Sequence, residues 1–366
     1  MRFVALAAAA ALVLSGCATT ATTAPAVESD QTAASTVECT TAALPETRIE
    51  IAALPAGPTS ACITETGLHS PAPTTPSLPV TVTDAQGTEV TVTSADRILP
   101  LDLSGTISST VFALGLGDRV VGRDTATAFP EASALPLVTQ HGHQLNGEAI
   151  LGLDPTVILT DTSLGPWDVI LQMREAGIPV VVLPANRSIG SMGEFITDVA
   201  DALGVPEAGA ALAATAESAV DASAARIDAI LPDSPGERLR MMFLYVRGSA
   251  NVYYVFGEES GADELIHALG GVDAAADAGI TGMRPLTAEA IVTAAPDVVL
   301  VMTHGLESVG GVDGLLEKVP ALAQTPAGEQ RRIIDVPDHE ILSFGPDYSA
   351  VLDGVGAAIY APGDAR

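Results

Sequence analysis

Two histidines stand on either side of a glycine in the segment Gln140-His141-Gly142-His143-Gln144. A neutral imidazole offers a nitrogen lone pair to a metal ion, and a hydrogen bond to its other nitrogen can fix the ring. The segment is therefore a candidate donor site for a metal or a metal-containing ligand. A polar loop that happens to hold two histidines is the alternative.

Tyr245 and Arg247 form a second candidate site at the end of the apolar run 240–247. Residues i and i+2 of a strand point to the same face, so the phenol and the guanidinium can meet there. A nearby cation favours the phenolate, which is a hard anionic donor that suits ferric iron. The alternative is a tyrosine at a strand end whose hydroxyl reaches water beside an exposed arginine.

Strands and helices alternate around both sites, and these elements must position them. The run 80–92 predicts a β-hairpin with its turn at Asp84-Ala-Gln-Gly87. Short strands that alternate with helices indicate an α/β fold with parallel sheets. Further strands are expected at 97–102, 119–123, 156–160, 179–183, 240–247 and 297–302, and helices from near Ser104, at 167–176 and at 261–269.

A long alanine-rich helix and an internal repeat divide this α/β region in two. The helix is expected at 206–232, and the strand–helix alternation restarts after it. Residues 145–160 (LNGEAILGLDPTVILT) and 286–301 (LTAEAIVTAAPDVVLV) share one spacing from a glutamate to a proline that precedes an apolar strand. Repeated units on both sides of one helix predict two similar lobes, at 80–205 and 233–366.

The first residues have the pattern of an export signal. A basic start and an apolar run precede Ser15-Gly16-Cys17, which resembles a lipobox. We therefore expect a signal peptide at 1–16 and a lipid anchor on Cys17, which would hold the chain at the extracytoplasmic face of the cell membrane. Ordinary secretion is the alternative.

Residues 17–79 are rich in Ala, Thr, Pro and Ser, which predicts a tether that buries no core. An oxidising location favours a disulfide between Cys39 and Cys62, with two free thiols as the alternative.

The chain is strongly acidic, with 45 acidic and 16 basic residues and a formal net charge of −29. Such a surface repels nucleic acid and anionic lipid, so neither is an expected partner and the membrane is reached through the anchor alone. The sequence contains no phosphate-binding loop, zinc-protease motif or nucleophile elbow, and no enzyme is expected. His267, His304 and His339 lack metal-ligand spacing and are interpreted as surface residues, although His304 follows a strand that ends at Met302 and could line the cleft.

The lipobox, the hairpin turn, the paired Glu-Ala-Ile units and the single connecting helix together resemble the ABC-importer binding proteins for haem, cobalamin and ferric siderophores. The resemblance covers about residues 80–362. It implies a class III periplasmic-binding-protein-like fold, with two Rossmann-like lobes joined by one long α-helix and cargo in the cleft between them.

The histidine and tyrosine sites resemble most closely those of the haem-receptor lipoproteins of the HmuT type from actinobacteria, which implies haem b as the transported ligand. The spacing to the lobe glutamate then implies His141 and Tyr245 as axial ligands of the iron. Arg247 would bond the phenolate, and His143 is a competing donor.

The internal repeat, together with this resemblance, indicates residues that would surround the porphyrin. Met283 and Arg284, the C-terminal counterparts of the histidine loop, are expected at its edge and at its propionates, where Arg187 is a further candidate donor. The aromatic residues that would cover the apolar edge stay unranked: Tyr253, Tyr254, Phe256 and Trp167.

Glu148 and Glu289 are implied to lie on the outer tips of the lobes and to pair with arginines of a dimeric permease. As helix N-terminal acids favoured by the helix dipole, they also have a purely structural explanation. The implied partners are haem, the ABC permease with its ATPase, and upstream haem-binding surface proteins. A siderophore or cobalamin receptor of the same fold stays open, as does a lipid-anchored hydrolase that would use Glu148 with Asp154.

Overall fold

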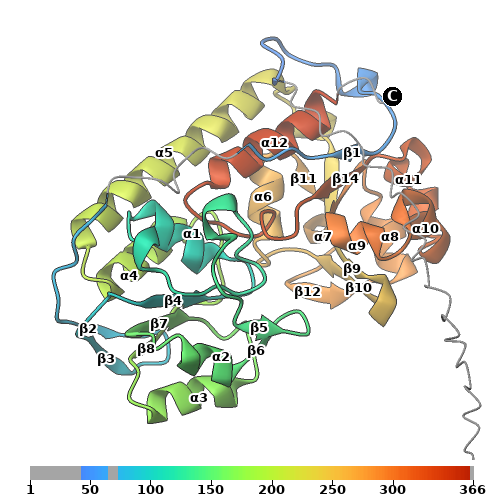
Figure 1. Cartoon of the computed structure of the whole chain (residues 1–366). Helices are drawn as coiled ribbons and strands as arrows, with labels where there is room; N and C mark the ends of the chain where they lie inside the picture. Colours follow the sequence, from blue (N-terminus) through green and yellow to red (C-terminus); the bar gives the residue numbers. More distant parts are fainter. Residues whose placement is uncertain (1–42, 65–72, 363–366) are drawn as a thin grey trace, which may run out of the picture. The chain divides into compact units, whose positions relative to one another are not determined.

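The computed structural model describes residues 43–64 and 73–362 (Figure 1). All described residues belong to one compact unit. The expected signal peptide, Cys17 and Cys39 lie outside the described residues. Among the helices of the described part, none combines the length and the apolar character needed to cross a bilayer.

The N-terminal lobe is built on a parallel three-stranded sheet in the order β4-β7-β8. Every residue of these strands is buried, because helices cover both faces of the sheet and continuous apolar runs are then required. Helices α1 and α4 pack on one face, and α2 and α3 pack on the other (Figure 1). The bounds are β4 Ile98–Leu101, α1 Thr106–Ala113, α2 Gly147–Gly152, β7 Val157–Thr160, α3 Trp167–Glu175, β8 Val180–Val182 and α4 Met192–Ala202.

Two hairpins complete this lobe. The predicted hairpin forms from β2 (Val80–Thr83) and β3 (Glu89–Val92), and the Asp84 carboxylate accepts two backbone N–H groups within its turn. A shorter hairpin, β5 (Thr139–Gln140) with β6 (Gln144–Leu145), carries the two histidines at its tip. The strand expected at 119–123 is wrong, since only two isolated bridges form there, from Val120 to Ile98 and from Arg123 to Leu137.

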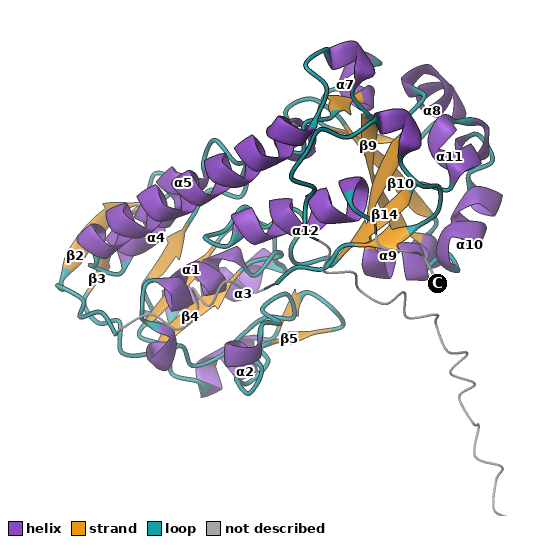
Figure 2. Cartoon of the chain, turned by 90° about the horizontal axis from the view of Figure 1, so that it is seen from above, coloured by secondary structure: helices purple, strands orange, loops and turns teal. Residues whose placement is uncertain are grey.

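One long helix, α5 (Pro206–Ile230), connects this lobe to the C-terminal lobe, and the last helix α12 (Tyr348–Tyr360) packs beside it (Figure 2). The apolar side chains of both helices belong to one continuous core, which also contains residues of both sheets. The interface between the lobes is therefore packed along α5.

The C-terminal sheet has the order β1-β14-β13-β9-β10-β12, with β11 pairing the start of β9. Strands β1, β14, β13 and β9 run parallel, and β10 and β12 are antiparallel additions. Helices α5, α6 and α12 cover one face, and α7 to α11 cover the other. The bounds are β1 Thr59–Ser60, β9 Arg240–Arg247, β10 Val252–Phe256, α6 Ala262–Ala268, β11 Val272–Asp273, α7 Ala274–Asp277, β12 Met283–Pro285, α8 Ala288–Ala294, β13 Val298–Met302, α9 Thr303–Glu307, α10 Gly311–Lys318, α11 Pro326–Gln330 and β14 Ile333–Val336.

The tether expected at 17–79 is corrected at residues 43–64, which we call the strap. The strap adds β1 to the edge of the C-terminal sheet, where Ser60 pairs with Asp335, and its apolar side chains pack on the main core. Arg332 donates hydrogen bonds to the carbonyl oxygens of Leu54 and Pro55 at 2.7 and 3.2 Å. The strap needs no core of its own because it completes the core of the lobe.

Candidate functional site

Tyr245 and Arg247 meet at the carboxyl end of β9, as the strand periodicity predicts. Arg247 Nε donates a hydrogen bond to Tyr245 Oη at 3.1 Å, and the guanidinium carbon lies 5.1 Å from the centre of the tyrosine ring. Both side chains are partly buried. A charged donor on the phenol oxygen favours the phenolate, so this arrangement is suited to a ferric-iron ligand.

Asp338 holds this pair from the other side. Its Oδ1 accepts a hydrogen bond from Arg247 at 3.1 Å, and its Oδ2 accepts the backbone N–H of His304 at 2.9 Å. The His304 imidazole lies 3.2 Å from the same oxygen and is 74% exposed. Burial alone would lower the pKa of the Arg247 guanidinium, but Tyr245 and Asp338 outweigh it and the pKa is raised. Arg247 is therefore positioned as a fixed positive charge behind the tyrosine.

The histidine hairpin is shaped by an unusual backbone. His141 has a φ of 47° and Gly142 a φ of 90°, so the chain reverses within the three residues between β5 and β6. Thr125 Oγ1 bonds Thr139 at 2.7 Å and donates to the Gly142 carbonyl oxygen at 2.6 Å, which ties the hairpin tip to the lobe. Both histidines are exposed there.

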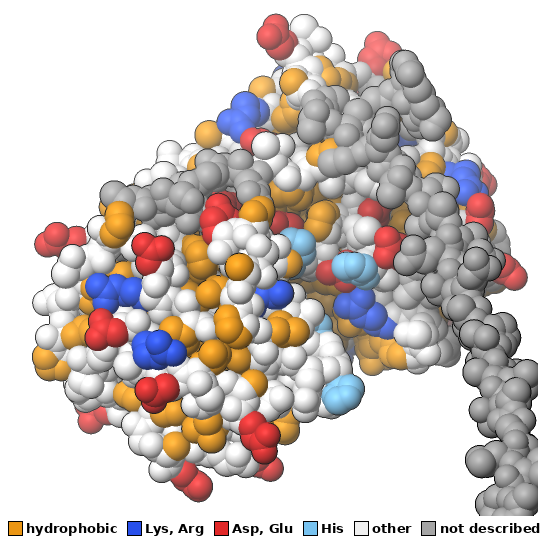
Figure 3. Space-filling view, viewed as in Figure 1, with side chains coloured by type: hydrophobic (Ala, Val, Ile, Leu, Met, Phe, Trp, Pro, Cys, Tyr) orange, Lys and Arg blue, Asp and Glu red, His pale blue; other side chains and the backbone are white. Residues whose placement is uncertain are grey.

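His143 reaches the electrostatic environment of the opposite lobe. Although His143 is exposed at the hairpin tip, partial loss of water around its imidazole is the main cause that lowers its pKa; Arg247 lowers the pKa further, and Asp338 opposes both. The lowered pKa favours the neutral imidazole, which is the form that binds a metal. Histidine side chains gather around the hollow between the lobes, next to basic and acidic side chains (Figure 3). The structure therefore brings the two predicted sites together across this hollow.

The sheet register ranks the aromatic and porphyrin-edge candidates. Tyr254 is directly opposite Tyr245, and Phe256 is opposite Met283, so these four side chains share one face of the sheet. Met283 is 53% exposed. Among the other aromatic candidates, Tyr253 packs against the core behind the sheet, and Trp167, the first residue of α3, packs against the core of the N-terminal lobe.

Two of the expected propionate donors are not placed for that role. Arg284 is opposite Val255, which is buried in the core behind the sheet, so Arg284 lies on the face away from Tyr245. Arg187 is bound at 2.8 Å to Asp102 and at 2.6 Å to Asp161, with 5% of its side chain exposed. Its sequence position after β8 made it a candidate donor to the propionates, but two buried carboxylates hold its guanidinium inside the N-terminal lobe.

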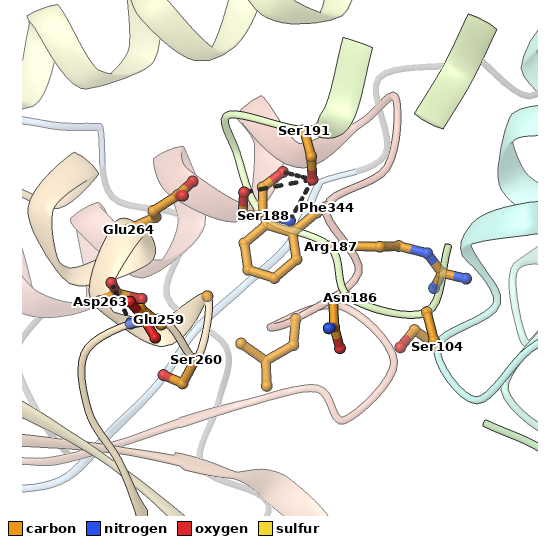
Figure 4. A pocket seen from close by; sticks show the side chains of 13 residues that line it. Ser104, Asn186, Arg187, Ser188, Ser191, Glu259, Ser260, Asp263, Glu264 and Phe344 are labelled. Atoms are coloured by element: carbon orange, nitrogen blue, oxygen red, sulfur yellow. Dashed lines mark hydrogen bonds between the residues drawn. The ribbon is translucent and has the colours of Figure 1, made fainter. Parts of the chain in front are cut away.

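A polar pocket of about 590 Å³ lies between loops of the two lobes (Figure 4). Asn186 and Ser188 line it from the N-terminal lobe, and Glu259 and Glu264 line it from the other. Glu264 accepts the backbone N–H of Gly190 at 2.9 Å, which links the lobes there. The lining includes neither histidine of the hairpin nor Tyr245, so this pocket is separate from the predicted donor site.

Glu148 and Glu289 occupy equivalent positions in the first turns of α2 and α8, and both are exposed. They lie in different lobes, so the structure does not assemble them into one acid–base site. Asp154, the partner in the hydrolase alternative, follows α2 with a φ of 46°.

Asp338 is a residue of the candidate site that sequence reasoning missed, whereas His304 was expected at the cleft only as an alternative to a surface position. They follow β14 and β13, which run parallel to β9, so all three strands end at one edge of the sheet. The available sequence signal was their position just after predicted parallel strands, where ligand-binding residues are commonly found. No cluster of three or more His, Cys, Asp or Glu side chains within the described ranges could hold a bare metal ion.

Comparisons with known proteins identify the family of this chain. The family model described as periplasmic binding protein matches residues 103–340. The crystal structure of the haem-binding protein HmuT is 40% identical, with a TM-score of 0.76, over 84% of this chain and 98% of that one. Structures of HmuT variants carry alanine in place of a histidine, a tyrosine, or an arginine two positions after that tyrosine.

Two curated relatives are transport or binding proteins as well. The uncharacterised ABC transporter substrate-binding lipoprotein YvrC of Bacillus subtilis is 26% identical over 77% of this chain and 86% of its own. A cobalamin-binding protein of Halobacterium salinarum is 34% identical over 63% of this chain. The matched part corresponds to 61% of the length of that protein. The chain therefore belongs to the periplasmic binding protein family, whose matched relatives bind substrates for transport and are not enzymes.

Proposed function

We propose that this protein captures haem b between its two lobes and delivers it to an ABC permease. The hydrogen bond from Arg247 to Tyr245 is the observation that carries the proposal, because it prepares a phenolate donor for ferric iron. The similarity to haem-binding HmuT, over nearly that whole chain, supports haem as the cargo. The HmuT variants at a tyrosine and an arginine two positions apart match the spacing of this pair.

Tyr245 supplies the anionic axial ligand of the iron in this proposal. Arg247 stabilises the phenolate, and Asp338 is a positioning residue that holds Arg247. Tyr254, Phe256 and Met283 form the apolar surface on which one edge of the porphyrin rests, since they share the face of Tyr245.

The second axial ligand comes from the histidine hairpin. The family spacing assigns this role to His141, and His143 supports the ligand as the competing donor. The pKa of His143 is lowered, by loss of water around the imidazole and then by the charge of Arg247, which favours a neutral imidazole near the tyrosine site. Alanine at each histidine separates the two assignments.

The chain would act at the extracytoplasmic face of the cell membrane. Its location follows from the proposed lipid anchor on Cys17 and from the lipoprotein relative YvrC. Cys62 is disulfide-bonded, and we propose Cys39 as its partner. Glu148 and Glu289 would pair with basic residues of the permease, and upstream haem-binding surface proteins would supply the cargo.

A cobalamin receptor is the second candidate, favoured by the Halobacterium relative. A cobalamin receptor does not require one protein ligand to the metal from each lobe. The presence of a histidine site and a tyrosine site therefore favours haem over cobalamin.

Ferric haem titrated into the purified protein tests the proposal. We expect a shifted Soret band at one haem per chain, and a different band for Tyr245→Phe, which keeps the ring but removes the oxygen. Cyanocobalamin in the same titration should give no saturable change. An unshifted Soret band with the wild-type protein would refute haem capture.

A further inference from the structure

His304 stands beside the tyrosine site but has no role in the ligation proposed above. It is the second residue of α9, the helix that follows β13, and β13 pairs in parallel with β9, which carries Tyr245. The next residue is Gly305, where a Cβ would lie 2.8 Å from the Val246 carbonyl oxygen. A glycine at this position lets α9 approach the end of β9 closely, so His304 is held at the sheet edge where Tyr245 lies.

The Asp338 carboxylate orients the His304 imidazole. Its Oδ2 accepts the backbone N–H of His304 at 2.9 Å and lies 3.2 Å from the imidazole Nδ1. A carboxylate at this distance favours the proton on Nδ1, which leaves the lone pair on Nε2 at the far side of the ring. The side chain is 74% exposed, so an incoming metal can reach it.

His339, the neighbouring histidine, is arranged differently. Its Nε2 lies 3.4 Å from Glu340 Oε1, and 36% of its side chain is exposed. Burial is the main cause that lowers the pKa of His339; Asp338 opposes this shift, and His304 adds to it. Of the two histidines at this edge, His304 is therefore the accessible donor.

His304 lies on the way from solvent to the tyrosine site. Asp338, which orients His304, also acts electrostatically on His143 in the hairpin of the other lobe, so the imidazole belongs to the hollow between the lobes. Tyr245 is partly buried, whereas His304 is largely exposed. A ligand that enters this hollow therefore meets the imidazole before it meets the phenol.

We propose that His304 is an entry donor, which binds the iron of an incoming ferric haem before Tyr245 does. This rests on the proposed haem capture and deepens it. The Nε2 lone pair displaces a water molecule from one axial position of the iron, and the phenolate of Tyr245 then displaces the imidazole, with the iron ferric throughout.

The geometry of the sheet supports this exchange. The two donors follow adjacent parallel strands at one edge of the sheet, so both act on the same face of the porphyrin. Asp338 serves both steps, since it orients the first donor and holds Arg247, which supports the second.

Stopped-flow mixing of ferric haem with the full-length protein, followed at the Soret band, tests this proposal. In His304→Asn an amide keeps a donor toward Asp338 but lacks the outer nitrogen. Association and dissociation should both slow about tenfold, within the range that variants of one site span, with Kd within about twofold of wild type. The final Soret band should be that of the wild type, because Tyr245 and the hairpin are unchanged. His267→Asn is the matched control, since His267 is an exposed histidine on α6, and it should keep wild-type rates.

Iron-free protoporphyrin separates metal binding from other effects of the substitution. It should enter the wild type and His304→Asn at the same rate, and slower entry into the variant would overturn the entry donor. Slow haem binding by His304→Ala with wild-type rates for His304→Asn would also overturn it, because His304 would then only hold Asp338.

Failure of the entry donor and failure of haem capture are distinguishable. Equal haem association rates for the wild type and His304→Asn, with a shifted Soret band in both, would overturn the entry donor and leave haem capture intact. An unshifted band with the wild type would refute the capture itself.

Discussion

Replacing Arg247 by methionine tests whether the guanidinium supports Tyr245 as an iron ligand. Methionine keeps the length of the side chain and leaves the phenol in place, but it removes the donor that bonds Tyr245 Oη at 3.1 Å. It also leaves the Asp338 carboxylate without its arginine, close to the phenolate. Both changes disfavour the anionic ligand, so haem affinity should fall.

The size of this effect follows from the exposure of the pair. A hydrogen bond to a charged group contributes roughly 1.5–3 kcal/mol, which corresponds to about ten- to 150-fold in affinity. Arg247 is 33% exposed, so solvent screening places the loss near the lower end, at about tenfold. The second substitution Asp338→Asn should restore part of this loss, because it removes the uncompensated negative charge.

Haem titration followed at the Soret band measures both quantities. Arg284→Met is the matched control, since the register places Arg284 on the opposite face of the sheet. It should bind haem as the wild type does. The role of Arg247 in supporting Tyr245 would be refuted if Arg247→Met kept the wild-type haem affinity and spectrum. It would also be refuted if Arg284→Met lost more haem affinity than Arg247→Met.

Three further outcomes are expected. His141→Ala should shift the Soret band of the haem complex, and His143→Ala should change it less; the reverse order would make His143 the ligand. Burial and Asp102 raise the pKa of Asp124 to about 7, so its contribution to stability is complete below about pH 4 and is lost as the pH rises to about 7. Between pH 5 and pH 8 the wild type should therefore lose on the order of 3 kcal/mol more than Asp124→Asn in urea unfolding, and equal slopes would contradict this. Arg332→Ala should loosen the strap and speed its cleavage by a protease, with the body left intact; unchanged cleavage would show that β1 alone holds the strap.

Much of the fold follows from local patterns in the sequence. Strand β9 has the bounds that its apolar run predicts, and α5 begins at Pro206 as expected. The repeat correctly indicates that α2 with β7 and α8 with β13 are equivalent units. The meeting of Tyr245 with Arg247 was predictable because it depends only on the two-residue period of one strand.

Contacts between distant segments were not predictable in this way. Asp338 reaches Arg247 only because β14 and β9 lie parallel with β13 between them, which no local pattern specifies. Arg284 was misplaced because the repeat offset ignores the antiparallel strand β12, whose alternation decides which face each side chain takes. The strap was predicted to be a tether because its apolar residues are few and scattered. They nevertheless pack into a core that other segments of the chain form.

The two donors proposed for haem differ in what each lobe must provide. A phenolate needs a fixed positive charge, and that charge needs its own counter-ion; the C-terminal lobe supplies both from residues at the ends of parallel strands. A histidine needs only a neutral nitrogen, and a hairpin tip held by Thr125 is sufficient for that. Loss of Tyr245 should therefore reduce haem affinity more than loss of either histidine. Without the phenolate, the charges of Arg247 and Asp338 remain in the cleft but no longer stabilise a ligand of the iron. Equal losses for Tyr245→Phe and His141→Ala would mean that the charge network contributes nothing to ligation.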